Sequence, residues 1–398
     1  MPAIRYPRFL FTPRFVAILF IGLTLIITTQ HYLKGLNSYN NYLIFARPFS
    51  NLLAGNNLYL EYPKLYYDTY KYSPTFALFM GVFAVLPDWL GLLGWNLLNT
   101  VVFYTAGRRL FPDPRRGLVF LLLLVVDMMT ALHNSQANCL LVGLMLWVYI
   151  NLEEGKPGWA GLCVALAFFI KIYGAGIGLL FLLYPAYTVR GILWGALYGV
   201  LLGVAPLLVT SWPNFLMQYK GWFDIVQASA TAAQFSIMGW LTSWFHLDVR
   251  KGPIQAAGLA LLLLPLILYW RRRTEAEFRG LYLALIPIFV VVFNQMAESP
   301  TFVIPVAGFL FWWLQYRRST PVAPALFVLV LLFTMLISTD IYPHFLRSGF
   351  FNTYKIKVVP MILAWALLQV QLLGYSVWQP RLTAARQTAE ATPIAMRA

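Results

Sequence analysis

Residues 158–210 read GWAGLCVALAFFIKIYGAGIGLLFLLYPAYTVRGILWGALYGVLLGVAPLLVT, and the only charged side chains among them are Lys171 and Arg190. Uninterrupted apolar runs of about 18 residues or more are typical of helices that cross a lipid bilayer. A stretch of this length with two isolated charges leaves room for three such helices separated by short turns. This part of the chain therefore predicts membrane-spanning α-helices.

The composition of the whole chain points the same way. Of its 398 residues, 60% are hydrophobic and only 11% are charged, whereas a soluble domain carries about 25% charged residues. This composition excludes a soluble enzyme, a disordered regulator and a secreted disulfide scaffold. Cys139 and Cys163 both lie in apolar runs and form no CxxC pair, so neither a disulfide framework nor a zinc site is indicated.

Similar apolar runs recur along the full length. They predict an all-α polytopic membrane protein with about twelve transmembrane helices, placed at 15–33, 89–107, 117–132, 136–152, 158–172, 174–187, 190–210, 254–270, 280–294, 301–316, 322–338 and 357–378. Residues 75–86 are apolar too, but as a helix they would cover only about 18 Å of a hydrocarbon core of about 30 Å. We expect this segment to be interfacial or re-entrant.

The basic residues predict the orientation of the chain. Most of the 29 Lys and Arg residues fall in short clusters between spans, such as 108–116 and 271–279, and such clusters mark the cytoplasmic side. The net charge of +15 therefore reflects membrane topology and not nucleic-acid binding. We expect a bacterial inner-membrane protein with both termini cytoplasmic, one membrane domain over 1–380 and a disordered cytoplasmic tail over 381–398.

This orientation places the longest loops, 34–74 and 211–253, on the extracytoplasmic side, where function is expected. From Tyr42 to Leu53 apolar and polar residues alternate at near-helical spacing. This pattern predicts an amphipathic helix on the membrane surface between the first two spans.

Ionisable residues at membrane depth cost about 2.5–3.5 kcal/mol each at a helix centre, so they are informative. Lys171, near the outer end of its span, can hold an anionic group or act as an interfacial anchor. Asp127 lies about a turn and a half below His133, and we expect it to have an internal hydrogen-bonding partner, for instance His133. Glu298 ends a span and is either a solvated helix-terminal charge or part of an outward-facing site.

Four glycines recur at every fourth residue in the span at 190–210, at Gly191, Gly195, Gly199 and Gly203. The spacing places them on one helix face and predicts close packing against a neighbouring helix.

Five short motifs, in this order, carry a family resemblance. They are LLAGNNLY at 52–59, YKYSPTFALFMGVFAVLP at 70–87, WNLLN at 95–99, NSQAN at 134–138 and AGLCVALAFFIKIYG at 160–174. Together they resemble the GT87 family of membrane glycosyltransferases, and the resemblance covers most of the chain. It implies a GT-C fold.

The resemblance also implies an activity. Members of the family transfer a sugar, mannose-like or pentofuranose, from a polyprenyl-phosphate donor to an extracytoplasmic glycan or glycolipid acceptor, with inversion. Such an enzyme requires membrane lipid but neither a cofactor nor a metal, because the donor is already activated. The expected class is a polyprenyl-phosphate-sugar-dependent hexosyl or pentosyl transferase.

The resemblance implies three sets of site residues. The family usually places an aspartate just after the first span, where this chain has asparagines, and an amide cannot act as a general base. The candidate catalytic carboxylates are therefore Asp68, Glu298 and Glu61. The candidates for binding the donor phosphate are Lys171, Lys71 and His133, and those for binding sugar or acceptor are Asn40, Asn41, Tyr72, Gln136, Asn138 and Asp340.

Two other interpretations compete with this one. A transporter or flippase for lipid-linked sugars or small molecules also uses about twelve helices, but it should show internal repeats or paired interrupted helices, and no convincing repeat relates the two halves. A catalytically degenerate member of the family is favoured by the missing aspartate.

Overall fold

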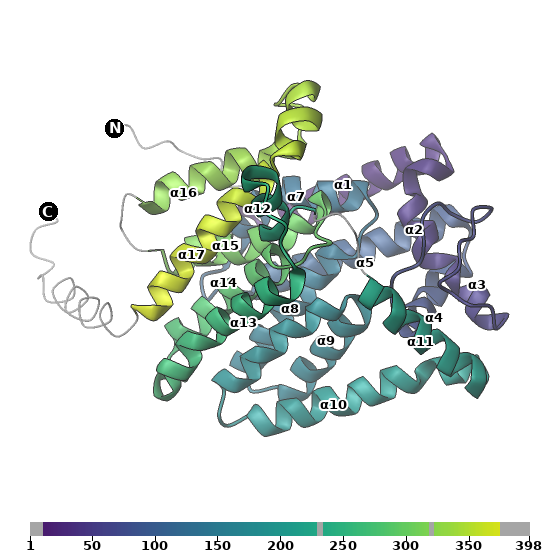
Figure 1. The fold of residues 1–398 in the computed structure, drawn as a ribbon, viewed down its shortest axis with the longest axis horizontal. Helices are drawn as coiled ribbons and strands as arrows, with labels where there is room; N and C mark the ends of the chain where they lie inside the picture. Colours follow the sequence, from purple (N-terminus) through teal and green to yellow (C-terminus); the bar gives the residue numbers. More distant parts are fainter. Residues whose placement is uncertain (1–10, 229–233, 318–321, 375–398) are drawn as a thin grey trace, which may run out of the picture.

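The computed structural model describes residues 11–228, 234–317 and 322–374, and within these ranges the chain forms helices and turns with no strand. The all-α prediction is thus confirmed for the described chain (Figure 1). The predicted tail at 381–398 lies outside the described residues.

In its described residues, the first half of the chain contains ten α-helices, one long 3-10 helix and the short 3-10 helix η2 Leu36–Tyr39. Their bounds are α1 Pro13–Lys34, α2 Asn40–Ala46, α3 Pro48–Leu53, α4 Pro74–Ala84, α5 Asp88–Arg109, α6 Pro114–Leu123, α7 Val125–His133, α8 Asn138–Glu153, α9 Pro157–Ile170, η3 Ile172–Leu183 and α10 Thr188–Val204.

The second half continues with α-helices and short 3-10 or π-helical segments. Their bounds are η4 Ala205–Leu208, α11 Trp212–Ala228, α12 Ile237–Phe245, α13 Lys251–Leu268, α14 Ala276–Val292, η6 Ser299–Phe302, α15 Val303–Gln315, α16 Val322–Val330, η7 Leu331–Met335, η8 Leu336–Ser338, η9 Leu346–Phe351, η10 Ile356–Val358 and α17 Val359–Leu373.

Several helices begin at a proline that follows a capping side chain. The hydroxyl of Ser73 accepts the N–H of Phe76 ahead of α4, and the carboxylate of Asp113 accepts the N–H of Arg115 ahead of α6. Proline suits the first helical position because its fixed φ angle is already helical and no N–H is lost there. These local signals set where the helices start.

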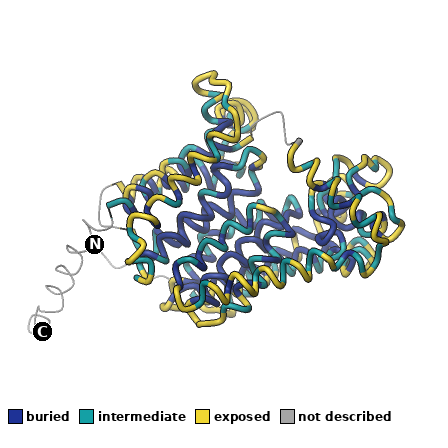
Figure 2. The backbone as a smooth tube through the Cα atoms, turned by 60° about the horizontal axis from the view of Figure 1, so that its bottom comes forward, coloured by how far each residue is buried: buried dark blue, intermediate teal, exposed yellow. Residues whose placement is uncertain are grey.

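The core is formed by helices that are buried on nearly all sides. In α8 every residue except Trp147 and Glu153 is buried, and α14 and α15 are buried over most of their length. Figure 2 shows these central helices enclosed by segments whose outer faces are exposed. A helix without a polar face needs neighbours around its whole circumference, so the central helices organise the bundle.

Helix α10 has the opposite character, because Gly191 is its only buried residue and its exposed side chains are largely Leu and Val. It lies along α9 at the edge of the bundle (Figure 1). A Cβ on Gly161 of α9 would lie 2.7 Å from the backbone nitrogen of Gly195. The glycine stripe therefore packs closely at Gly195, while Gly199 faces open space.

Within the described residues, four helical segments are at least 18 residues long and apolar enough to cross a membrane. They are 13–34, 188–208, 251–268 and 356–373. A fifth span arises if α6 and α7, which meet at a bend of 49°, are counted as one. The other predicted spans are helical but shorter or more polar. The structure thus supports a multi-pass membrane protein, and the count of twelve stays a prediction.

Two of the helices predicted from the sequence differ in form from the prediction. Most of the predicted span at 174–187 is formed by η3, a 3-10 helix of 12 residues. Runs of 3-10 helix longer than about four residues are uncommon. The predicted amphipathic helix at 42–53 consists of two short helices, α2 and α3, and Tyr42 to Ala46 are all buried. A position on the membrane surface therefore stays a prediction.

Close packing of α14 on α15 generates a stability prediction. A Cβ on Gly308 would overlap the carbonyl oxygen of Ala284, and because that oxygen belongs to a helix backbone it cannot move aside. We expect Gly308→Ala to lower the free energy of unfolding by about 1–3 kcal/mol, measured as a lower Tm in detergent micelles.

Gly199→Ala is the matched control, because no atom lies within 4 Å of the position that a Cβ would occupy there. Its Tm should be unchanged or slightly raised, since alanine is the better helix former. Equal Tm values for both variants would contradict the packing described here.

Candidate functional site

Lys171 lies at the junction between two kinds of helix. It is the one extended residue between α9 and η3, with φ −148° and ψ 121°. Its Nζ donates a hydrogen bond of 2.9 Å to Oδ1 of Asn138, and it lies 5.9 Å from the ring centroid of Tyr173. The break in the helix thus turns the lysine toward the start of α8.

The position of Asn138 is fixed by the WNLLN motif of α5. Nε1 of Trp95 donates to the carbonyl of Ser135, at 2.8 Å, and Oδ1 of Asn99 accepts the N–H of Leu140, at 3.0 Å. Ser135 has a left-handed φ of 47°, which makes the tight turn between α7 and α8. The motifs at 95–99 and 134–138 therefore build one structure that presents Asn138.

The same turn leaves two buried side-chain groups unpaired within the described part of the chain. Nδ2 of Asn138 and Oε1 of Gln136 are both buried and have no hydrogen-bond partner within the described part of the chain. Buried polar atoms are nearly always paired. Both predicted sugar-binding side chains thus have hydrogen-bonding capacity left for a bound molecule.

The aromatic-proline segment is tied to the end of α9. The hydroxyl of Ser73 donates to the carbonyl of Phe169, at 2.6 Å, two residues before Lys171. Tyr59 donates to the carbonyl of Tyr72, at 3.0 Å. These bonds place Tyr72 beside the junction that carries Lys171.

Glu298 reaches the same region from the loop between α14 and α15. Its side chain is exposed, and it is close enough to interact electrostatically with Lys171, Tyr72 and Tyr173. Among the described residues, no cation lies within salt-bridge distance of its carboxylate. Glu298 therefore lies within electrostatic range of two other predicted residues, Lys171 and Tyr72, and Lys171 is in turn bonded to a fourth, Asn138.

Asp68 has a different environment. Both oxygens of its carboxylate accept hydrogen bonds from Nζ of Lys71, at 3.1 and 2.9 Å, and Oδ1 also accepts the N–H of Thr69, at 2.7 Å. Partial burial raises the pKa of Asp68, but the bonds from Lys71 and Thr69 outweigh it and hold this pKa below the ordinary value. The predicted base and one predicted phosphate ligand thus neutralise each other.

Asn40 and Asn41 make structural bonds. The amide of Asn40 donates to the carbonyl of Tyr67, at 2.9 Å, and accepts its N–H, at 2.8 Å. An aspartate could accept that N–H but would repel the carbonyl. Asn41 donates to the carbonyl of Asn134, at 2.9 Å. Asn40 thus holds the loop next to Asp68.

His133 and Asp127 do not pair with each other, so that expectation is wrong. Nδ1 of His133 lies 2.9 Å from Nε2 of His31, whose Nδ1 lies 2.7 Å from the carbonyl of Ser38. Because a carbonyl only accepts, His31 carries its proton on Nδ1, and the neutral ring then accepts at Nε2 from His133. Asp127 instead interacts electrostatically with Lys357.

The two remaining predicted residues lie elsewhere on the surface. Asp340 forms an ion pair with Arg347, at 2.8 Å, and its side chain is 95% exposed. Glu61 is exposed in the loop between α3 and α4. No contact between either residue and Lys171, Asn138, Tyr72 or Glu298 is found in the described part of the chain.

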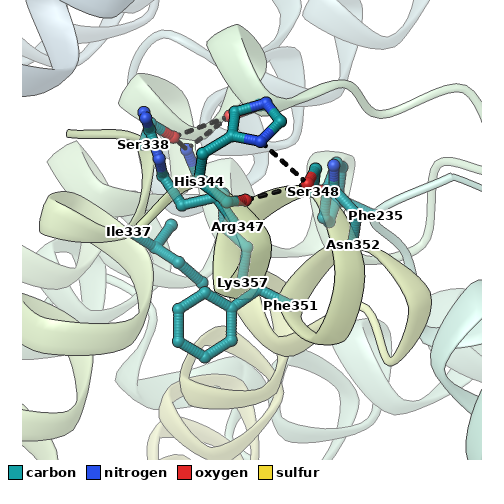
Figure 3. Close-up of a pocket in the computed structure, with 10 residues that line it drawn as sticks. Phe235, Ile337, Ser338, His344, Arg347, Ser348, Phe351, Asn352 and Lys357 are labelled. Atoms are coloured by element: carbon teal, nitrogen blue, oxygen red, sulfur yellow. Dashed lines mark hydrogen bonds between the residues drawn. The ribbon is translucent and has the colours of Figure 1, made fainter. Parts of the chain in front are cut away.

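The sequence analysis missed a second polar centre around Lys357. This lysine is 2% exposed, and it donates hydrogen bonds of 2.8 Å to the hydroxyls of both Ser299 and Ser338. Together with His344 and Arg347 these residues line a cavity (Figure 3). The available signal was a lysine at the very start of an apolar span, next to two polar loops.

Comparison with solved structures gives a remote similarity. The chain is similar to ArnT from Cupriavidus metallidurans, crystallised with undecaprenyl phosphate, at 18% sequence identity and a TM-score of 0.37, over 95% of this chain and 81% of that one. A TM-score this low does not establish a common fold. No curated protein matches the chain.

The family comparison is more informative. The sequence model of glycosyltransferase family 87 matches residues 70–294, which is more than half of the chain. The match includes the aromatic-proline segment, the turn that carries Asn138 and the junction at Lys171. The chain belongs to glycosyltransferase family 87.

Proposed function

We propose that the protein transfers a sugar, mannose-like or pentofuranose, from a polyprenyl-phosphate donor to an extracytoplasmic glycan or glycolipid acceptor, with inversion, on a GT-C-type scaffold. Family membership supports the transferase class. The apolar helices support a donor carried in the membrane. The observation that carries the proposal is the convergence of Glu298, Lys171, Tyr72 and Asn138 from separate elements.

Glu298 is the carboxylate best placed to act as the general base. A base needs an oxygen lone pair that is free to accept a proton. The oxygens of Asp68 are occupied by Lys71 and Thr69, whereas Glu298 is exposed and, within the described chain, has no salt-bridge partner. Lys171, fixed by Asn138, lies close enough to orient the carboxylate electrostatically.

The reaction then balances in one step. Glu298 removes the proton of the acceptor hydroxyl as the acceptor oxygen attacks the anomeric carbon. The bond from that carbon to the phosphate oxygen breaks, and its electron pair remains on the lipid phosphate. The amides of Gln136 and Asn138 have free capacity to hold sugar hydroxyls. The acceptor is glycosylated and the polyprenyl phosphate is released.

Transfer by purified protein tests this role directly. Synthetic radiolabelled polyprenyl-phosphate sugars and a cell-envelope glycolipid extract are supplied to the protein in lipid. We expect Glu298→Gln to lower the transfer rate about 10²- to 10⁴-fold, the usual contribution of a general base. Asp224→Asn, which removes an exposed carboxylate from α11, is the matched control and should retain the wild-type rate.

Other outcomes are equally specific. Full activity in Glu298→Gln would show that Glu298 is not the base and that another carboxylate has this role. If no donor gives product with the wild type, the transferase assignment fails, and a transporter or a degenerate family member becomes the better description.

Asp68 yields a prediction about pH. A carboxyl with a lowered pKa stabilises the fold above its unfolded pKa, and this contribution is lost only as the pH falls through the folded value. For Asp68 that value lies below the ordinary 3.8. The Asp68–Lys71 ion pair should therefore persist between pH 5 and 8.

Accordingly, Asp68→Asn should shift the rate by less than about tenfold and leave the shape of the pH–rate profile unchanged across this range, since an exposed ion pair is worth about 0–1 kcal/mol. A loss as large as that expected for Glu298→Gln would identify Asp68 as the base.

A further inference from the structure

A cavity of about 310 Å³ lies between the start of η6, the end of η8 and the loop that contains η9 (Figure 3). Its lining carries the cationic side chains of Lys357 and Arg347, the imidazole of His344 and the hydroxyls of three serines, and no carboxylate is among the described lining residues. A cavity with this donor-rich lining suits an anion.

Lys357 and two serines form a compact donor group at its base. Nζ donates to the hydroxyl oxygens of Ser299 and Ser338, each at 2.8 Å, and those oxygens are 2.9 Å apart. One hydroxyl can donate to the other, which leaves one O–H and one N–H without an acceptor in this group. Two donors are thus available to the oxygens of a tetrahedral anion.

Arg347 adds a second cation. One of its terminal nitrogens pairs with Asp340, at 2.8 Å, while its Nε is buried and has no partner in the described part of the molecule. His344, three residues earlier, lies beside Ser348, with Nδ1 3.4 Å from the hydroxyl oxygen. The unpaired Nε gives a further donor for a bound anion.

Asp127 lies behind the cavity and not in it. Its carboxylate interacts electrostatically with Lys357 but is not part of the lining, and its Oδ2 is buried without a partner among the described residues. A buried charge without a counter-ion is costly. The carboxylate of Asp127 thus favours a charged ammonium group on Lys357 through the electrostatic interaction between them.

The surroundings of the cavity favour an anion attached to a lipid. Phe235, Ile337 and Phe351 supply an apolar part of the lining. On the adjoining loop, Ile341 and Phe345 are 65% and 71% exposed. Large apolar side chains exposed on one segment of a membrane protein suit contact with hydrocarbon. A free phosphate ion has no hydrocarbon chain that could contact these apolar side chains.

We propose that this cavity binds the phosphate group of a prenyl-phosphate lipid, and that Lys357 and Arg347, in place of Lys171, receive the leaving phosphate. The inference rests on the proposed function. Glu298 and Ser299 are consecutive, and Glu298 is extended, with φ −100° and ψ 167°. The proposed base therefore lies next in sequence to Ser299, which lines the cavity.

Equilibrium binding to the full-length protein in nanodiscs tests the site separately from catalysis. The probes are a short-chain prenyl phosphate, the corresponding prenyl alcohol and inorganic phosphate. We expect Arg347→Gln and Ser338→Ala each to weaken binding of the prenyl phosphate, Arg347→Gln by about 10- to 100-fold. Neither variant should change binding of the prenyl alcohol. Both leave the buried side chains of Asp127 and Lys357 unchanged, so they are expected to fold.

Two further variants sharpen the assignment. Lys220→Met removes an exposed cation from α11 and should bind like the wild type. Lys171→Met should keep prenyl-phosphate affinity within about threefold while it lowers transfer.

The outcomes separate the two proposals. Loss of prenyl-phosphate binding in Lys171→Met, with full binding in Arg347→Gln and Ser338→Ala, overturns this site and leaves the proposed function standing. Binding of inorganic phosphate with the same variant dependence, but not of the prenyl phosphate, supports the anion site and overturns its lipid ligand. A wild type that neither binds the prenyl phosphate nor transfers sugar overturns both.

Discussion

The buried ammonium group of Lys357 is the constraint on which the arrangement of the outer face depends. A charge that is 2% exposed in an apolar bundle must be paired or hydrogen-bonded. Its hydrogen-bond acceptors are Ser299 of η6 and Ser338 of η8, and Asp127 of α7 interacts with it electrostatically. Holding them together joins the first half of the chain to the second and places Glu298 beside a cavity.

Lys171, like Lys357, is held by a hydrogen bond to a residue from another helix. Lys171 occurs where α9 gives way to a 3-10 helix, and its hydrogen bond to Asn138 connects that junction to α8. Ser73 ties the aromatic-proline loop to the same junction. Interrupted helices expose backbone and side-chain polar groups, which a membrane protein tolerates where they line a cavity. The breaks between helices in this bundle are therefore the positions that best suit polar side chains with a chemical role.

Local patterns predicted much of this structure. Apolar runs located helical segments, but they did not give the helix starts at Pro74 and Pro114. That Lys171 and Glu298 serve a functional site stays a prediction. The hydrogen bond between His31 and His133, and the electrostatic interaction of Asp127 with Lys357, could not be predicted, because each joins residues far apart in sequence. The lengths of α-helix, 3-10 helix and π-helix also depend on packing that one sequence does not reveal.

The central claim is that the sugar lies between the Glu298 carboxylate and a phosphate held by Lys357. The most direct measurement is an experimental structure of the full-length protein in a nanodisc with bound polyprenyl phosphate. We predict phosphate density within hydrogen-bonding distance of Lys357, Arg347 and Ser338, with the prenyl chain leaving past the loop that carries Phe345. Phosphate density on Lys171, with the Lys357 cavity empty, would contradict the account.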